Sequence, residues 1–178
     1  MTENTREMNY KRNLLLVATC SILLSILGTV GALLWTGRLT LSQASRQEMV
    51  HDMGSNVMPF DLGQTTHIFE MTESGGIQQV VAKDPNDSAQ IALIQQHIQH
   101  EVMLFSTGDF SDPMSLHTSE MPGVQELSAG AALIKVDYTA LPNGAQITFT
   151  TQDIHLITEI HRWFGAQLSD HGSDATAR

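Results

Sequence analysis

Cysteine is nearly absent from this chain, since Cys20 is the single one among 178 residues. The rest of the chain can therefore form neither an internal disulfide nor a thiolate metal site, and it offers no cysteine nucleophile. Basic residues are also few, with 9 Lys and Arg against 19 Asp and Glu, a formal charge of −10. A surface of this sign repels nucleic-acid backbones, so we expect no DNA or RNA partner.

Three sequence motifs that would indicate a common enzyme class are missing as well. The chain has no Gly-x-x-x-x-Gly-Lys phosphate loop and no Gly-x-Gly-x-x-Gly dinucleotide fingerprint. It also has no Gly-x-Ser-x-Gly nucleophile elbow. A nucleotide-dependent enzyme or a serine hydrolase therefore has no support in the sequence.

Charged side chains are absent from Leu14 to Trp35, a run of about 22 residues that as a helix would span roughly 30 Å. This run predicts a single transmembrane helix. The apolar core of a secretory signal peptide is shorter, about 7–15 residues, so an uncleaved anchor is favoured over a cleaved signal. The basic residues flanking the run place the N-terminus in the cytoplasm: Arg6, Lys11 and Arg12 before it, Arg38 and Arg46 after it.

The chain then divides into five expected segments, which place its larger part outside the inner (plasma) membrane, in a bacterial periplasm or its equivalent. They are a cytoplasmic tail over 1–12, the transmembrane anchor over 13–36, a juxtamembrane linker over 37–57, an exported domain over 58–172 and a disordered tail over 173–178. The exported part is long enough for one small domain with one core.

Hydrophobic periodicity within the exported part predicts two ββα modules. The expected elements are strands over 65–72 and 77–82 with a helix over 88–106, and strands over 133–139 and 145–151 with a helix over 154–168. Asp87 and Asp153 are suited to cap the two helices. Prolines near 113 and 122 predict two short helices between the modules. We therefore expect an α+β domain in which the hairpins share one antiparallel sheet of four strands, with helices packed on it.

Histidine and methionine are concentrated after the anchor. All 8 histidines and 7 of the 9 methionines lie there. Imidazole and thioether ligands together suit copper in an oxidising compartment, which favours a domain that handles or senses a metal. The opposing interpretation is that methionine fills gaps in a core and that the histidines are structural.

Individual positions rank the candidate metal ligands. The principal ones are His67, His117, Met121 and His161, and a second group comprises His97, His100 and His171. His161 falls within the expected apolar stripe of its helix, where it either binds a ligand or is satisfied by a backbone carbonyl. Strand alternation would let His67 meet it under the sheet. The linker adds Met49, His51, Met53 and Met58, which a metal or an amphipathic surface would explain equally well.

Two further functions compete with metal binding. Trp163 is expected to project away from the apolar stripe of its helix and so to mark an interaction surface, for a membrane protein partner or a homo-oligomer. The second alternative is a small enzyme that uses His161 with an acidic partner such as Asp170. The chain shows no nucleophile, base and orienting group together, so this alternative is the less favoured one.

Three stretches resemble a family of small bacterial proteins with unestablished roles. They are Met-Pro-Phe-Asp-Leu-Gly-Gln-Thr-Thr-His-Ile-Phe over 58–69, Ser-Asp-Pro-Met-Ser-Leu-His over 111–117 with Met-Pro-Gly over 121–123, and Trp-Phe-Gly-Ala-Gln-Leu-Ser-Asp-His-Gly over 163–172. Members of this family often carry the label aspartate carbamoyltransferase. This chain has neither the length of that two-domain enzyme nor its Ser-Thr-Arg-Thr phosphate loop, so carbamoyltransferase activity is not expected. The resemblance directs attention to His67, His117, His161 and His171.

Overall fold

The computed structural model describes residues 21, 25 and 43–178. The predicted anchor, the tail over 1–12 and the first part of the predicted linker lie outside these residues, apart from Ser21 and Ser25. Those two are helical, and the Ser25 hydroxyl donates a hydrogen bond to the carbonyl of Ser21 over 2.9 Å. Within the described residues, none of the helices combines the length and the apolar character that crossing a membrane requires. The chain divides into the units Met1–Leu41 and Ser42–Arg178, and the second unit is described below.

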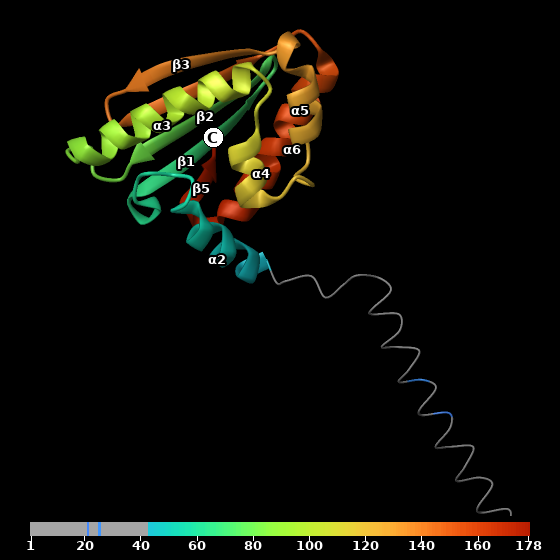
Figure 1. Cartoon of the computed structure of the whole chain (residues 1–178), viewed down its shortest axis with the longest axis horizontal. Helices are drawn as coiled ribbons and strands as arrows, with labels where there is room; N and C mark the ends of the chain where they lie inside the picture. Colours follow the sequence, from blue (N-terminus) through green and yellow to red (C-terminus); the bar gives the residue numbers. More distant parts are fainter. Residues whose placement is uncertain (1–20, 22–24, 26–42) are drawn as a thin grey trace, which may run out of the picture. The chain divides into compact units, whose positions relative to one another are not determined.

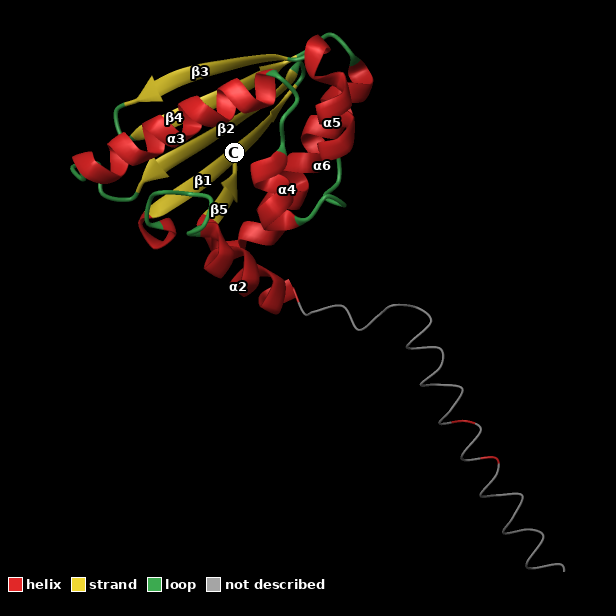
Figure 2. Ribbon diagram, viewed as in Figure 1, coloured by secondary structure: helices red, strands yellow, loops and turns green. Residues whose placement is uncertain are grey.

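A mixed five-stranded sheet forms the base of this α+β domain (Figures 1 and 2). Its order is β3-β4-β2-β1-β5, where the strands are β1 (Thr65–Thr72), β2 (Gly75–Ala82), β3 (Lys135–Leu141), β4 (Gly144–Thr150) and β5 (Ala175–Ala177). The hairpins β1–β2 and β3–β4 join through antiparallel pairing of β2 with β4, as the sequence predicts. β5 is parallel to β1. The sequence-based expectation of a wholly antiparallel sheet of four strands is therefore wrong at this edge.

Helices pack on one face of the sheet, because alternate strand residues there are apolar. Their bounds are α2 (Gln43–Gly54), α3 (Ser88–Ser106), α4 (Ser111–His117), α5 (Val124–Gly130) and α6 (Ile154–His171). α3 covers β3, β4 and β2, whereas α6 covers β2, β1 and β5 (Figure 1). The caps predicted for α3 and α6 are confirmed, since Asp87 accepts from the backbone of Gln90 and Asp153 from that of His155.

The core lies between the sheet and these helices and is centred on aromatic rings. Phe149 of β4 and Phe105 of α3 meet Trp163 of α6 edge to face, with ring centroids 5.5 Å and 5.7 Å from it. Phe110, just before α4, meets the same indole 5.5 Å away. Gly123 permits the close approach of α5 to α6: its φ is +86°, and a side chain there would collide with the carbonyl of Glu159. α6 is thus covered on two sides.

Two segments that the sequence analysis placed outside the folded part belong to it. Residues 43–54 of the predicted linker form α2, which packs against α6, and Val50 on it is 3% exposed. The predicted disordered tail forms a short turn and then β5, and the backbone N–H of Arg178 donates to the carbonyl of Phe69 over 3.0 Å. Neither segment has the periodicity of a long amphipathic element, and tertiary contacts hold both.

Candidate functional site

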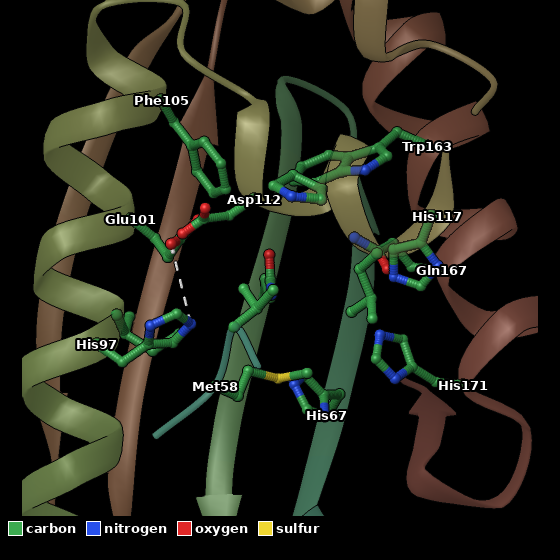
Figure 3. A pocket seen from close by; sticks show the side chains of 15 residues that line it. Met58, His67, His97, Glu101, Phe105, Asp112, His117, Trp163, Gln167 and His171 are labelled. Carbon is green, nitrogen blue, oxygen red and sulfur yellow. Dashed lines mark ion pairs between the residues drawn. The ribbon is translucent and has the colours of Figure 1, made fainter. Parts of the chain in front are cut away.

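A small cavity lies between the sheet and the helices, with about 50 Å³ of space that water can occupy. Its wall is formed by side chains from β1, β2, α3, α4 and α6, together with Val57 and Met58, which follow α2 (Figure 3). That volume is enough for a few water molecules or a bound ion. Four histidines line it, and so do two acidic residues, Glu101 and Asp112, but no lysine or arginine.

Buried polar atoms without a hydrogen-bond partner gather in this cavity. Among the described residues there are six such side-chain atoms, and each belongs to a residue of the cavity wall: His67 Nδ1, Gln78 Oε1, Glu101 Oε1, His117 Nε2, Trp163 Nε1 and Gln167 Oε1. A buried polar group without a partner costs on the order of 1–3 kcal/mol. Folded proteins contain few of them, so their convergence on one space makes this cavity the candidate site for a polar ligand, an ion or bound water.

His117 is held in one orientation by a carboxylate. It ends α4 with 1% of its surface exposed, and its Nδ1 lies 2.9 Å from Oδ2 of Asp170 on α6. Asp170 also accepts two hydrogen bonds from Arg46 of α2, over 2.6 Å from Nε and 2.9 Å from Nη2. Because an ionised carboxylate can only accept, Nδ1 of His117 carries the proton. Its Nε2 therefore presents a lone pair to the cavity.

The pKa values of this pair agree with that assignment. Burial raises the pKa of Asp170, but the hydrogen bonds from Arg46 and His117 outweigh it and leave the pKa below its ordinary value. Burial lowers the pKa of His117, and the hydrogen bond to Asp170 opposes this only in part. Asp170 is therefore ionised and His117 neutral at neutral pH.

Two further imidazoles lie against His117. The ring of His171, at the end of α6, meets the ring of His117 edge to face with centroids 5.0 Å apart. It also stacks on His67 of β1, with centroids 4.7 Å apart and planes 18° apart. Burial lowers the pKa of His67 to about 4 and brings the pKa of His171 well below its ordinary value. We call His67, His117 and His171 the imidazole cluster; all three are neutral at pH 7.

Figure 3 shows the imidazole cluster and the sulfur of Met58 on one side of the cavity, with His97, Glu101 and Asp112 on the other side. Met58 is 6% exposed. Glu101 is 5% exposed, and its carboxyl forms a hydrogen bond with that of Asp112. Burial, followed by this hydrogen bond and the charge of Asp112, raises the pKa of Glu101 to about 8. One side of the cavity thus offers soft donors and the other holds a protonated acid.

The structure does not bring all the predicted ligands together. Of the principal candidates, only His67 and His117 belong to the imidazole cluster, and His171 of the second group completes it. Met121 is buried but lines another hollow with Glu120 and Arg162, and His100 is exposed on α3. His97 lies in the cavity wall, with Nε2 3.9 Å from Oε1 of Glu101.

His161 is satisfied by backbone carbonyls, which is the structural one of the two interpretations offered for it. Its Nε2 lies 3.0 Å from the carbonyl of Thr72 and 2.8 Å from that of Gly75, so one ring nitrogen is used at the β1–β2 turn. It does not meet His67 under the sheet, and the acidic partner expected for it, Asp170, instead binds His117. The predicted pairing of His161 with Asp170 is therefore wrong, because the histidine that binds Asp170 is His117.

The expectation of an exposed Trp163 is also wrong. Its side chain is 0% exposed, because the indole points into the core, where Phe149 of β4, Phe105 of α3 and Phe110 surround it. The predicted apolar stripe of α6 is correspondingly rotated, with Trp163 and Leu156 inside it and Ile157 and Leu168 at its margin. The buried face of α6 keeps the helical period but includes the polar residues Glu159, Gln167 and Asp170, so a pattern of apolar residues alone does not mark it.

The sequence analysis did not assign three of these side chains to the candidate site. Arg46 was assigned only to the flank of the anchor, and Glu101 and Asp112 were not singled out. The acidic residue in the apolar repeat of α3, next to Ile98 and Phe105, was the available signal for Glu101, since an unpaired charge is rarely buried without a role. Arg46 gave no local signal, because its partner lies 124 residues away.

No family model matches this chain, and comparison with curated proteins and with solved structures likewise finds no similar protein. The resemblance to the small bacterial family therefore stays a prediction. The site has to be interpreted from its own chemistry.

Proposed function

We propose that this protein is a membrane-anchored domain on the outer face of the plasma membrane that binds a soft metal ion, with copper favoured. The ligands would be the imidazole cluster and Met58. One observation carries the proposal: His67 Nδ1 and His117 Nε2 are buried, belong to neutral rings, have no partner and open onto the same cavity.

The donor chemistry supports a soft metal. Metal ions bind the neutral form of imidazole, and burial keeps all three rings of the cluster in that form at pH 7. Thioether sulfur combined with imidazole suits copper rather than calcium or magnesium. The Asp170–His117 hydrogen bond supports it further, since metal-binding histidines commonly donate their other N–H to a carboxylate, which orients the ring.

Metal uptake would require a rearrangement. Among the described residues, no group of three or more His, Cys, Asp or Glu side chains is arranged to hold a metal. The reason is the stacking of His67 on His171: nitrogen lone pairs lie in the ring planes, and those planes are nearly parallel. Turning one of these rings would direct a nitrogen into the cavity that His117 and Met58 also line. Binding should therefore change the environment of His67 and His171 together.

Titration of the unit Ser42–Arg178 with Cu(I), Cu(II) and Zn(II) tests the proposal. We expect about one Cu(I) per domain with micromolar or tighter affinity. Asp170→Asn should weaken it about 10- to 100-fold, because the ring of His117 loses its orienting carboxylate. The exposed Asp52→Asn on α2 is the matched control and should bind like the parent. The fragment has to retain Arg46, so it cannot begin at residue 58. No uptake of any of the three ions at micromolar concentration would refute metal binding.

The membrane location rests on the uncharged run from Leu14 to Trp35 and on its flanking basic residues. Protease added outside intact spheroplasts should digest the domain and remove a C-terminal tag. Protection of the tag, or recovery of the full chain in the soluble fraction, would contradict this location and with it the oxidising compartment that favours copper.

The two alternative functions make different predictions. An interaction subunit with purely structural histidines would bind no metal and would co-purify with a membrane protein or with itself, through a surface other than the buried Trp163. An enzyme would have to use His117 with Asp170 for acid–base chemistry. No serine, threonine or cysteine is among the residues that line the cavity, so covalent catalysis by a hydroxyl or thiol has no nucleophile there.

A further inference from the structure

The acidic side of the cavity holds one proton between two carboxyl groups. Glu101 of α3 and Asp112 of α4 both line the cavity, and Figure 3 shows their carboxyl groups side by side. Two carboxyl groups this close in a buried space repel each other when both are ionised, so one of them carries a proton and donates it to the other. Glu101 is the more deeply buried of the two, and its Oε1 faces the cavity without a partner. We call Glu101 and Asp112 the acid pair.

No fixed positive charge balances the acid pair within the cavity wall. Lysine and arginine are absent from the residues that line it, and Arg46 is bonded to Asp170 instead. The titratable groups around the acid pair are His97 and His100 on α3, Asp109 before α4, His117 on α4, His67 on β1 and His171 on α6. The rings of His67, His97, His117 and His171 have lowered pKa values through burial, so they add no positive charge at neutral pH.

A cation that enters this buried space changes that balance. It lies in the same cavity as the acid pair, where solvent screens charges less than it does at the surface. Its field favours the ionised form of Glu101 and disfavours the proton. The positive charge of the bound metal ion is then offset by the positive charge of the proton that leaves.

We propose that the cavity takes up its metal ion in exchange for the proton shared by Glu101 and Asp112. This inference rests on the proposed metal-binding function and adds that metal binding is coupled to proton release. In the exchange the O–H bond breaks, the electron pair stays on the carboxylate oxygen, and the proton passes to solvent; no group is oxidised or reduced. The acid pair then carries two negative charges, one of which compensates the bound ion.

The number of protons released per metal tests the exchange. Full-length protein in detergent is titrated by calorimetry at pH 7 with Cu(I), and with Ag(I) as a substitute that does not change oxidation state. The titration is repeated in two buffers that differ in ionisation enthalpy, which yields the proton count. We expect about one proton per ion for the parent and nearly none for Glu101→Gln, which has no proton to release. Glu70→Gln on β1, on the opposite face of the sheet, is the matched control and should release as many as the parent.

The pH dependence provides a second measurement. Glu101 is protonated below its pKa of about 8, so metal affinity of the parent should rise about tenfold per pH unit from pH 6 to pH 8. Glu101→Gln should show a nearly flat profile there. If that variant does not fold, Asp112→Asn replaces it: removing the neighbouring negative charge lowers the pKa of Glu101, and proton release at pH 7 should fall well below one.

The outcomes separate this inference from the proposed function. If metal binds but Glu101→Gln or Asp112→Asn releases as many protons as the parent, the exchange is refuted and metal binding stands. If the parent gives no binding heat with either ion and no metal is retained on dialysis, both are refuted. One proton released by the parent and almost none by Glu101→Gln supports the exchange.

Discussion

Replacing His67 by phenylalanine should reduce the loss in the free energy of unfolding that the domain undergoes as the pH is lowered. His67 stacks on His171 and lies 6.5 Å from both Phe60 and Phe69 between ring centroids, so a phenyl ring fits its surroundings. It also removes the unpartnered Nδ1. At pH 7.5 we expect the variant to be about as stable as the parent, because removing Nδ1 offsets the loss of the hydrogen bond between His67 and the backbone of Asp174.

The magnitude follows from the pKa of His67, which burial lowers from 6.5 to about 4. An unfolded chain binds a proton at this residue below pH 6.5, whereas the folded one does so only below about pH 4. Stability from the neutral ring is thus complete above pH 6.5 and is lost as the pH falls through that window. At about 1.36 kcal/mol per pKa unit, the parent loses roughly 2.5 kcal/mol through His67 between pH 7.5 and pH 4.5.

Urea unfolding of Ser42–Arg178 measures this loss, because Trp163 is the single tryptophan of that fragment and is buried. The drop in the free energy of unfolding between the two pH values should be about 2.5 kcal/mol smaller in His67→Phe than in the parent. The exposed His155→Phe on α6 should keep the parental drop. Equal drops in His67→Phe and the parent would refute the assignment of His67 as a buried, neutral ring.

Two further predictions concern stability. Trp163→Ala should lower the free energy of unfolding by about 3–5 kcal/mol in urea titrations followed by circular dichroism, because it empties the centre of the aromatic core; a loss under 1 kcal/mol would contradict its burial. Glu101→Gln should stabilise the domain by about 3 kcal/mol at pH 7 and by little at pH 4, because the parent carboxyl, with a pKa of about 8, must stay protonated when folded but ionises when unfolded. Equal gains at both pH values would contradict the raised pKa.

Local patterns predicted the elements of the two modules closely. The expected ranges 65–72 and 88–106 coincide with β1 and α3. These predictions succeeded because alternation along a strand, a helix period and an Asp cap are properties of neighbouring residues. The short α4 and α5 were also recognisable from prolines in or near their first turns.

The remaining features depend on partners far away in the chain. Trp163 faces Phe149 of β4 and Phe105 of α3 rather than solvent, and the polar Glu159 and Gln167 on the same face of α6 concealed this. Asp170 binds His117 and Arg46, which lie 53 and 124 residues away. The sequence could nominate histidines as a class, but only the packing of α4 and α6 against β1 determines which three of them meet. β5 has three residues, too few for any periodic signal.

Arg46 gives the first helix of the domain an influence over the cavity. The domain begins with α2, and the Arg46 guanidinium on this helix donates hydrogen bonds to the Asp170 carboxylate that orients the ring of His117. Gln47 adds a hydrogen bond of 2.8 Å to the carbonyl of Ser169 beside it. A mechanical load applied at residue 42 would therefore act on the contacts that orient this imidazole. Detachment of α2 would leave His117 as the remaining partner of Asp170 and would remove the two hydrogen bonds from Arg46 that fix the angle of this carboxylate.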